Sequence, residues 1–369
     1  MTSSEKRAES DLAQDAPYLS FCVHSRNDNH GGDMYRRMKA CLMGFFEQAE
    51  RYRLRSEIIL VDWNPPKNRP LLKDAYQWPE SSQFCTIRVI IVPPHIHERY
   101  PHWEKIPVNN CAAQNAAIRR AKGTYILSTC VDNLLSDELF CFLASENLGE
   151  SKMYRIDRCN VNRAVTRLKS VEEQIAYCRK NILKIDRFVP NLPLPGFEGT
   201  PGLYTGSPGD FTLLARKVWH KVRGYPEIDL VGRTSDSVLC YMAYLAGAEI
   251  EALRDPMQLY HIDHDVRTNS TESNWWTRTG LKYIFPDQFA RTLRSWTRRF
   301  LPAKSGLKRL GIPIPSETDL KTLIIDMITG KRSHIYNDDT WGLGAENLKE
   351  FVVVQPEVSL VQAERSLTR

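Results

Sequence analysis

The chain has 369 residues, of which 42% are hydrophobic and 25% are charged. This composition is ordinary for a globular protein, and the length suits one large α/β domain with additions. The formal net charge of +6 is mild, so it permits an anionic ligand or membrane surface and gives no reason to expect nucleic acid as a partner.

The cysteines and the N-terminal residues indicate the compartment. Nine cysteines occur without a CxxC pair or a zinc-like cluster, which favours reduced thiols in a cytoplasmic protein. Residues 1–17 are polar and lack an apolar core, so we expect a flexible tail and not a signal peptide. No apolar run approaches the ~20 residues that a membrane span needs. We therefore expect a cytoplasmic protein, whose contact with a membrane, if any, is peripheral.

Strands and helices alternate along the first part of the chain. Helical spacing of apolar residues over 33–52 and an alanine-rich stretch over 109–123 predict two helices, and Gly123 suits the C-terminal cap of the second. Strand-like apolar runs occupy residues 18–25, 56–63, 86–93 and 124–133. The alternation predicts a mostly parallel central sheet flanked by helices, in which ligands lie beyond the carboxyl ends of the strands.

The pattern loosens after about residue 150. Residues 189–210 are rich in Pro and Gly and predict a long loop. A strand and a short helix are expected over 211–227, and a further helix begins near Ser235. The short strand after it ends in His261 and His264.

Several of these segments together resemble the GT-A glycosyltransferases, in particular the family 2-like inverting enzymes. The match runs along roughly residues 18–265. Its segments, in chain order, are VHSRND, LVDWNPP, AAQNAAIRRAKGTYILSTCVDNLLSDEL, GSPGDFTLLARKVWHKVRGYPE, SDS and YHIDHD. The resemblance implies a GT-A, Rossmann-like fold, with a nucleotide-binding half over 18–133 and an acceptor and catalytic half over 134–265. Residues 266–369 would form a mainly helical or irregular C-terminal extension.

The same resemblance implies an activity. It is the transfer of a sugar from a nucleotide-diphosphate donor, with a UDP-sugar favoured, to an acceptor hydroxyl with inversion. Assembly of cell-surface polysaccharide or glycolipid would be the setting, by analogy only. The acceptor would then be a glycan or a lipid-linked molecule.

The resemblance places Asp132 in a DxD metal site, although Cys130 replaces the first acid and a thiolate is too soft for the ions concerned. A carboxylate suits Mn²⁺ or Mg²⁺ together with the diphosphate. The alternative is that Asp132 caps a helix beginning near Leu134. His261 is the second predicted ligand, and its alternative is a buried structural histidine. Because residues three apart in an extended segment point to roughly opposite faces, we expect at most one of His261 and His264 to face the site.

Asp236 is the candidate general base. The resemblance puts the SDS segment where the family carries a Glu-Asp pair, although the Glu is Ser235 here. A carboxylate at a helix start stays ionised and can accept the acceptor's proton. Simple capping is the alternative.

Nucleotide and donor contacts are predicted at the ends of the strands. Asp62 is expected to accept a hydrogen bond from the edge of uracil, and its alternative is a solvated carboxylate at a strand end. The further candidates are Ser25, Arg26, Asn27 and Asn115 for the nucleotide, and Gly209 and Asp210 for the donor sugar.

Two C-terminal segments stand out. Residues 289–300 place four aromatic or aliphatic side chains at helical spacing among arginines, which is typical either of a helix on an anionic membrane or of an ordinary docked helix. Residues 336–348 predict an ordered turn that packs back on the domain.

Two other functions remain open from the sequence. A nucleotidyltransferase would share a similar sheet, although the glycines of residues 24–33 do not form a phosphate-cradling pattern. A catalytically inactive nucleotide- or sugar-binding module would explain Cys130 and Ser235.

Overall fold

The computed structural model describes residues 16–187, 203–206, 209–228, 235–264 and 317–355. Residues 289–300, with their predicted membrane contact, lie outside this part of the chain. Among the described residues, every helix is too short or too polar to cross a membrane.

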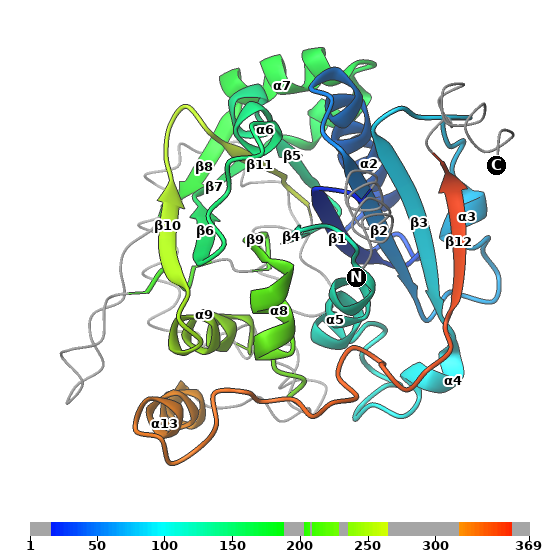
Figure 1. Ribbon diagram of the computed structural model, residues 1–369. Helices are drawn as coiled ribbons and strands as arrows, with labels where there is room; N and C mark the ends of the chain where they lie inside the picture. The colour runs from blue at the N-terminus through cyan, green and yellow to red at the C-terminus, as the bar shows by residue number, and fades with distance from the viewer. Residues whose placement is uncertain (1–15, 188–202, 207–208, 229–234, 265–316, 356–369) are drawn as a thin grey trace, which may run out of the picture.

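A large sheet forms the centre of the molecule (Figure 1). Its four middle strands, β4, β1, β2 and β3, run parallel to one another, whereas β9 and β12 are antiparallel to their neighbours. The predicted α/β class with a mostly parallel central sheet is therefore confirmed. In spatial order the strands are β10 (Glu249–Leu253), β6 (Lys152–Ile156), β9 (Phe211–Ala215), β4 (Tyr125–Thr129), β1 (Leu19–Ser25), β2 (Ser56–Trp63), β3 (Cys85–Val92) and β12 (Lys349–Val354).

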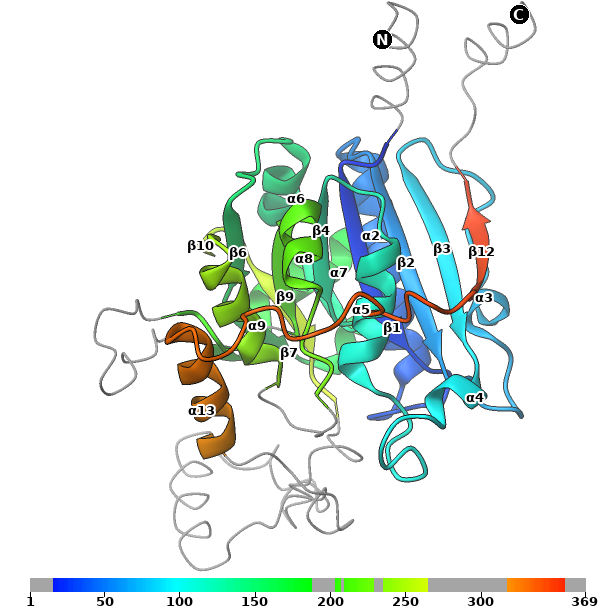
Figure 2. The ribbon, with the colours of Figure 1, turned by 60° about the horizontal axis from the view of Figure 1, so that its bottom comes forward.

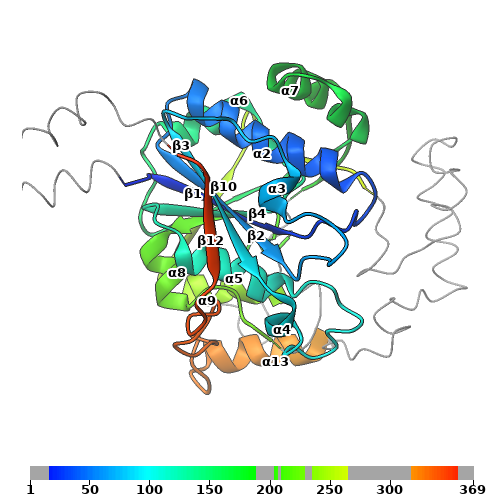
Figure 3. The same cartoon turned by 90° about the vertical axis from the view of Figure 1, so that its right-hand side faces the viewer.

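Helices cover both faces of this sheet (Figure 3). The long helix α2 (Met34–Arg51) and α6 (Asp137–Ala144) lie on one face, with α7 (Val171–Lys180) beside α2. The opposite face carries α5 (Asn110–Arg120), α8 (Arg216–Val222) and α9 (Ser235–Leu245), and α13 (Glu317–Ile328) packs on α9. The short helices α3 (Leu72–Ala75), α4 (Pro94–His97) and η1 (Arg163–Arg167) lie in the connections.

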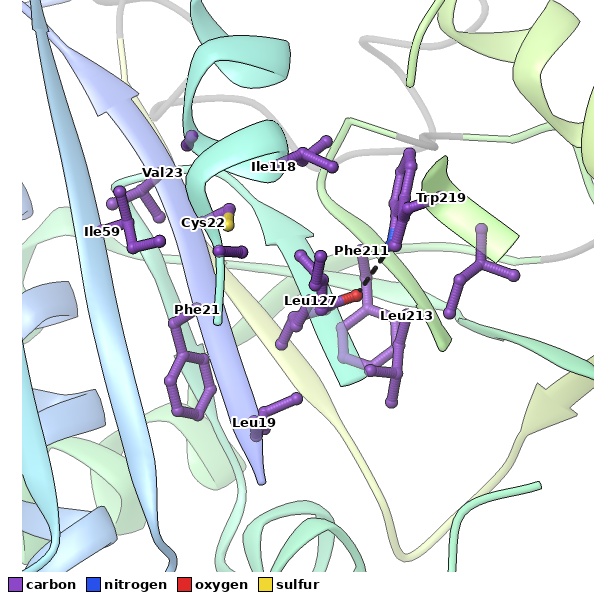
Figure 4. Packing of buried hydrophobic residues seen from close by; sticks show 14 of the residues in the cluster. Leu19, Phe21, Cys22, Val23, Ile59, Ile118, Leu127, Phe211, Leu213 and Trp219 are labelled. Atoms are coloured by element: carbon purple, nitrogen blue, oxygen red, sulfur yellow. Dashed lines mark hydrogen bonds between the residues drawn. The ribbon is translucent and has the colours of Figure 1, made fainter. Parts of the chain in front are cut away.

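The core forms because the β1 side chains alternate between the two helical layers (Figure 4). Phe21 stacks on Phe45 of α2, with 4.7 Å between the ring centroids. On the side of α8, Trp219 is fully buried and donates a hydrogen bond to the Ile126 carbonyl at 3.0 Å. Each such side chain contributes about 1.5–3 kcal/mol by leaving water, so the strands are held rigidly and their carboxyl ends are fixed in space.

A second, smaller sheet was not predicted. It contains β5 (Asn133–Leu135), β11 (Leu259–Ile262), β7 (Arg158–Val161) and β8 (Ile182–Asp186) in that order. β11 is antiparallel to β5 and parallel to β7. This pairing sets His261 opposite Asn133 and so brings residues far apart in the sequence to the end of β4.

Two local predictions are wrong. The segment near Leu134 is a strand and not a helix start; α6 begins at Asp137, where the Ser136 side chain accepts a hydrogen bond from the Leu139 amide at 3.2 Å. Gly123 does not cap α5, which ends at Arg120. Glycine is needed there because a Cβ would lie 2.7 Å from the Ser20 amide nitrogen.

The described C-terminal residues, 317–355, belong to the same unit as the sheet. Figure 2 shows the chain running from α13 past α9 and α5 to β12, which completes the sheet beside β3. Along this path Arg120 donates hydrogen bonds to the carbonyls of Gly342 and Leu343, both at 2.7 Å. The predicted packing of residues 336–348 on the domain is confirmed, whereas the strand after them was not predicted.

Candidate functional site

The carboxyl ends of the parallel strands bring several predicted residues to one edge of the sheet. Ser25 ends β1 and lies beside Asp62 of β2 in the parallel register. Asp132 follows the end of β4, the neighbour of β1 on the other side. All three are less than 9% exposed, so polar groups are held here at the border of the core.

Asp132 is the centre of a cluster with two histidines. The His261 Nε2 atom lies 3.7 Å from one carboxylate oxygen of Asp132, and the His264 Nε2 atom lies 3.3 Å from the other. One potential ligand atom from each residue lies within 4.8 Å of the others. The backbone fixes this arrangement, because the Ile262 amide donates a 2.9 Å hydrogen bond to the Asp132 carbonyl.

Both histidines therefore face the site, and the prediction of at most one was wrong. The alternation of side chains holds within a strand, but β11 ends at Ile262, so the alternation does not extend to His264. Sequence reasoning missed His264 as a ligand. The signal that could have found it was its position just beyond a short strand.

Arg37 is the fourth member of the cluster and was not predicted. Its side chain is 1% exposed, and its Nη1 atom lies 2.6 Å from Asp132 Oδ2. It also donates hydrogen bonds to the carbonyls of Gly32 and His30. The sequence feature that could have revealed Arg37 is its position in α2. It comes three residues after Met34 and four before Cys41, which puts it on the buried stripe of that helix.

The charges of the cluster compensate one another. Burial would raise the pKa of Asp132, but His261, His264 and Arg37 outweigh this effect and hold it well below its ordinary value. Burial lowers the pKa of His261 against the attraction of Asp132, which favours the neutral imidazole that metals bind.

The residues present fit a divalent cation. Two ligands about 2.1 Å from a shared ion are roughly 3 Å apart when they subtend a right angle, which is close to the separations of the His264 and His261 nitrogens from Asp132. Among the described residues, His261 Nδ1 is buried without a hydrogen-bond partner, so its ring is not committed to a structural role there. A carboxylate with imidazoles suits Mn²⁺ better than Mg²⁺.

Cys130 takes no part in the cluster. Its thiol donates to the Gly209 carbonyl at 3.3 Å, and burial raises its pKa well above the ordinary value. A neutral thiol is a poor ligand for a hard ion.

Gly209 and Asp210 are held beside the cluster. The Asp210 carbonyl accepts hydrogen bonds from Thr129 Oγ1 at 2.7 Å and Asn133 Nδ2 at 3.0 Å. The Asp210 carboxylate lies 2.9 Å from Arg158 Nη1, a partner that the sequence did not reveal. Their predicted contact with the donor sugar remains a prediction.

The nucleotide candidates form a second group on β1 and β2. Arg26 Nε donates to the Asn64 carbonyl at 2.6 Å, and Asn27 donates to the Pro70 carbonyl at 3.0 Å, so both are held in the loops at this edge. Within the described chain, Ser25 Oγ and Asp62 Oδ1 are buried without hydrogen-bond partners. Burial raises the pKa of Asp62 to about 6, although its other oxygen accepts the Leu72 amide at 2.8 Å.

Asn115 and Asp236 are the remaining candidates. Both amide hydrogens of Asn115 are used, by the Tyr225 carbonyl and by Glu227, each at 2.8 Å. Asn115 therefore anchors the segment after α8, and this geometry does not favour the predicted contact with the nucleotide. Asp236 lies in the first turn of α9, but its side chain is outside the described residues, so its role remains a prediction.

Comparisons with known proteins gave matches among solved structures alone. No protein-family model and no curated protein matches the chain. Residues 1–349 of TarS from S. aureus share 13% identity, with 66% of this chain and 60% of that chain covered and a TM-score of 0.40. GalNAc-T7, solved with UDP, GalNAc and Mn²⁺, shares 11% identity over 68% of this chain and 44% of that chain, with a TM-score of 0.42. For Drosophila beta1,4galactosyltransferase 7 in complex with xylobiose, the identity is 11%, both coverages are 68% and the TM-score is 0.33. The chain thus spans less than two thirds of TarS 1–349 and of GalNAc-T7.

Proposed function

We propose that this protein is a GT-A-type glycosyltransferase that moves a sugar from a nucleotide-diphosphate donor, with a UDP-sugar favoured, to an acceptor hydroxyl with inversion. The observation that carries the proposal is the cluster of Asp132, His261 and His264 at the carboxyl edge of the parallel sheet. Ligands of open α/β sheets bind at this edge. The order of sequence segments that resembles this family agrees with the proposal.

Different residues of the described structure would bind different parts of the donor. Asp132, His261 and His264 would hold Mn²⁺ or Mg²⁺, which when bound stabilises the negative charge of the departing diphosphate. Asp62 presents an oxygen without a hydrogen-bond partner in the described structure, which could accept the N–H of a uracil ring. Ser25, Arg26 and Asn27 line the same edge, and Asp210 would contact hydroxyls of the donor sugar.

Asp236 is proposed as the general base. It begins α9, where the helix dipole favours the ionised carboxylate that accepts a proton. The acceptor oxygen would lose its proton to Asp236 as it attacks the anomeric carbon from the face opposite the diphosphate, which inverts the configuration. Replacement of Asp236 by Asn should lower turnover by about 10²–10⁴-fold; a loss of only a few-fold in a folded variant would refute this role.

The setting is proposed by analogy with the family. The acceptor would be a glycan or a lipid-linked molecule in cell-surface polysaccharide or glycolipid assembly, and the protein would be cytoplasmic. Residues 289–300 would supply a peripheral contact with anionic lipid. Equal sedimentation with neutral and anionic vesicles would exclude that contact.

An inactive nucleotide- or sugar-binding module is the second candidate, and the ion pair between Arg37 and Asp132 favours it, because Asp132 already has a cation. A screen of nucleotide sugars for release of the nucleoside diphosphate, with and without Mn²⁺, separates the two functions. Release from one donor supports the transferase. Thermal stabilisation by UDP with no release from any donor supports the binding module. The absence of both effects would refute both functions.

A further inference from the structure

Arg37 is held in the cluster by more than its charge. Besides the 2.6 Å contact with Asp132, its Nε donates to the Gly32 carbonyl at 3.2 Å and its Nη2 donates to the His30 carbonyl. Gly31 and Gly32 both have positive φ, at 69° and 76°, a conformation that glycine adopts without strain. The loop between β1 and α2 is therefore shaped to present its carbonyls to this guanidinium.

The side of Asp132 that Arg37 contacts is specific. Arg37 and His264 both approach Oδ2, whereas His261 approaches Oδ1. A cation shared with the histidines must therefore lie close to the Arg37 guanidinium. Two positive charges at such separation in a buried place repel strongly.

Burial explains why a resident cation is needed. The Asp132 side chain is 8% exposed, and an ionised carboxylate with so little water is costly unless it is paired. Arg37 supplies the pairing charge permanently, since arginine does not lose its proton in proteins. The site is thereby stable before any metal arrives.

We propose that Arg37 is a built-in counter-ion of Asp132 that lets the site fold without metal and lowers its affinity for a divalent cation. The inference rests on the metal site of the proposed function and makes Arg37 the residue that sets metal affinity. A bound cation must either share Asp132 with Arg37 or displace it. Arg37 is a positioning residue here, because it acts on the site through Asp132.

The test compares two neighbouring arginines of α2. Arg37→Met removes the buried charge, and Arg36→Met removes one whose side chain is 57% exposed and lies 3.8 Å from Asp33. We would measure the unfolding temperature in EDTA and the affinity for Mn²⁺ by calorimetry. Arg37→Met should unfold at a lower temperature than the parent without metal, yet bind Mn²⁺ at least about tenfold more tightly. Arg36→Met should change neither.

A second set of variants distinguishes an effect on the metal site from a loss of the folded state. In the double variant Arg37→Met/Asp132→Asn both charges are gone, so it should regain most of the parent's stability and lose Mn²⁺ binding. Arg37→Lys keeps the charge and should keep the parent's affinity within a few-fold. The inference would be overturned if Arg37→Met bound Mn²⁺ more weakly than the parent or equally well. It would also be overturned if neither of these two proteins bound Mn²⁺. In both cases the donor screen still tests the proposed transferase independently.

Discussion

Two buried arginine–carboxylate pairs lie in different parts of the fold and have different surroundings. Arg88 of β3 and Glu57 of β2 lie 2.5 Å apart and are 5% and 2% exposed. Arg37 and Asp132 lie 2.6 Å apart and are 1% and 8% exposed. Distance and burial alone would assign both pairs the same role.

The partners around each pair distinguish them. Both oxygens of Glu57 are used. Oε2 accepts from Arg88 Nη1, and Oε1 accepts from Ser20 Oγ at 2.6 Å and from the Lys122 amide at 2.5 Å. The remaining N–H groups of Arg88 donate hydrogen bonds to Glu350 of β12 and to the Arg120 carbonyl. This network consists of strand residues and backbone, and its members satisfy one another.

The cluster of Asp132 has a different composition. It adds two imidazoles to the ion pair, and one nitrogen of His261 is buried without a partner in the described structure. It also lies where the strands end and the loops begin. A closed network stabilises a fold, whereas a cluster with unused ligand capacity at a sheet edge indicates a binding site.

The largest expected effect is on the closed network. Arg88→Met leaves Glu57 buried without its cation, so the free energy of unfolding should fall by about 3–5 kcal/mol. Activity per folded molecule should stay unchanged, because Arg88 is remote from the carboxyl edge. Urea unfolding measures the loss. The control is Arg99→Met, which removes an arginine 56% exposed and paired with Glu346, and should cost about 0–1 kcal/mol.

The next effect concerns the open cluster. Asp132→Asn keeps the shape but removes the charge that would hold a metal, and turnover should fall at least about 100-fold. Rates of nucleotide release, corrected for the folded fraction, measure this loss. Asp137→Asn on α6, with a side chain 33% exposed, is the control. A rate for Asp132→Asn within tenfold of the parent would argue against a catalytic metal.

How much of the fold and of the candidate site could be predicted from the sequence depends on the kind of residue. The apolar runs of β1, β2 and β3 predicted those strands within one residue, because burial on both faces imposes a continuous apolar pattern. Asp132 and His261 followed from a family pattern. Arg37 was missed because an arginine on a helix is usually exposed, and only its partner across the fold explains its burial. His264 was missed because its direction depends on where a short strand ends.

The two histidines provide a finer test of the cluster. His261→Asn and His264→Asn should each weaken Mn²⁺ binding at least about tenfold, since even outer partners of metal ligands contribute that much. Calorimetry with Mn²⁺ alone measures the affinity. His220→Asn is the control, because that residue lies on α8 and contacts Trp341. An effect of His261 only would restore the original prediction of a single histidine ligand.

Asp62 should show opposite effects on stability and binding. The folded state favours the protonated form, since its pKa is raised to about 6 by burial, so the ionised carboxylate lowers stability above that pH. Asp62→Asn should therefore raise the unfolding free energy at pH 7 by something on the order of 1 kcal/mol. This gain should shrink as the pH falls from about 6 towards 4, because the folded parent takes up its proton in that range. UDP affinity should fall about tenfold if Asp62 accepts the base N–H, and unchanged affinity would exclude that contact.

The smallest effect belongs to the outer member of the closed network. Glu350 pairs with Arg88 at 2.6 Å but its side chain is 32% exposed, so water screens the pair. Although burial opposes it, hydrogen bonding to Arg88 lowers the pKa of Glu350 below its ordinary value. Its stabilising contribution is thus complete above about pH 4.5 and is lost as the pH falls through the folded-state pKa. Glu350→Gln should cost about 0.5–1 kcal/mol at pH 7 in urea unfolding, and the difference from the parent should close as the pH falls through the folded-state pKa. A loss as large as that of Arg88→Met would mean that β12 is essential to the network, and the distinction between its buried and outer members would fail.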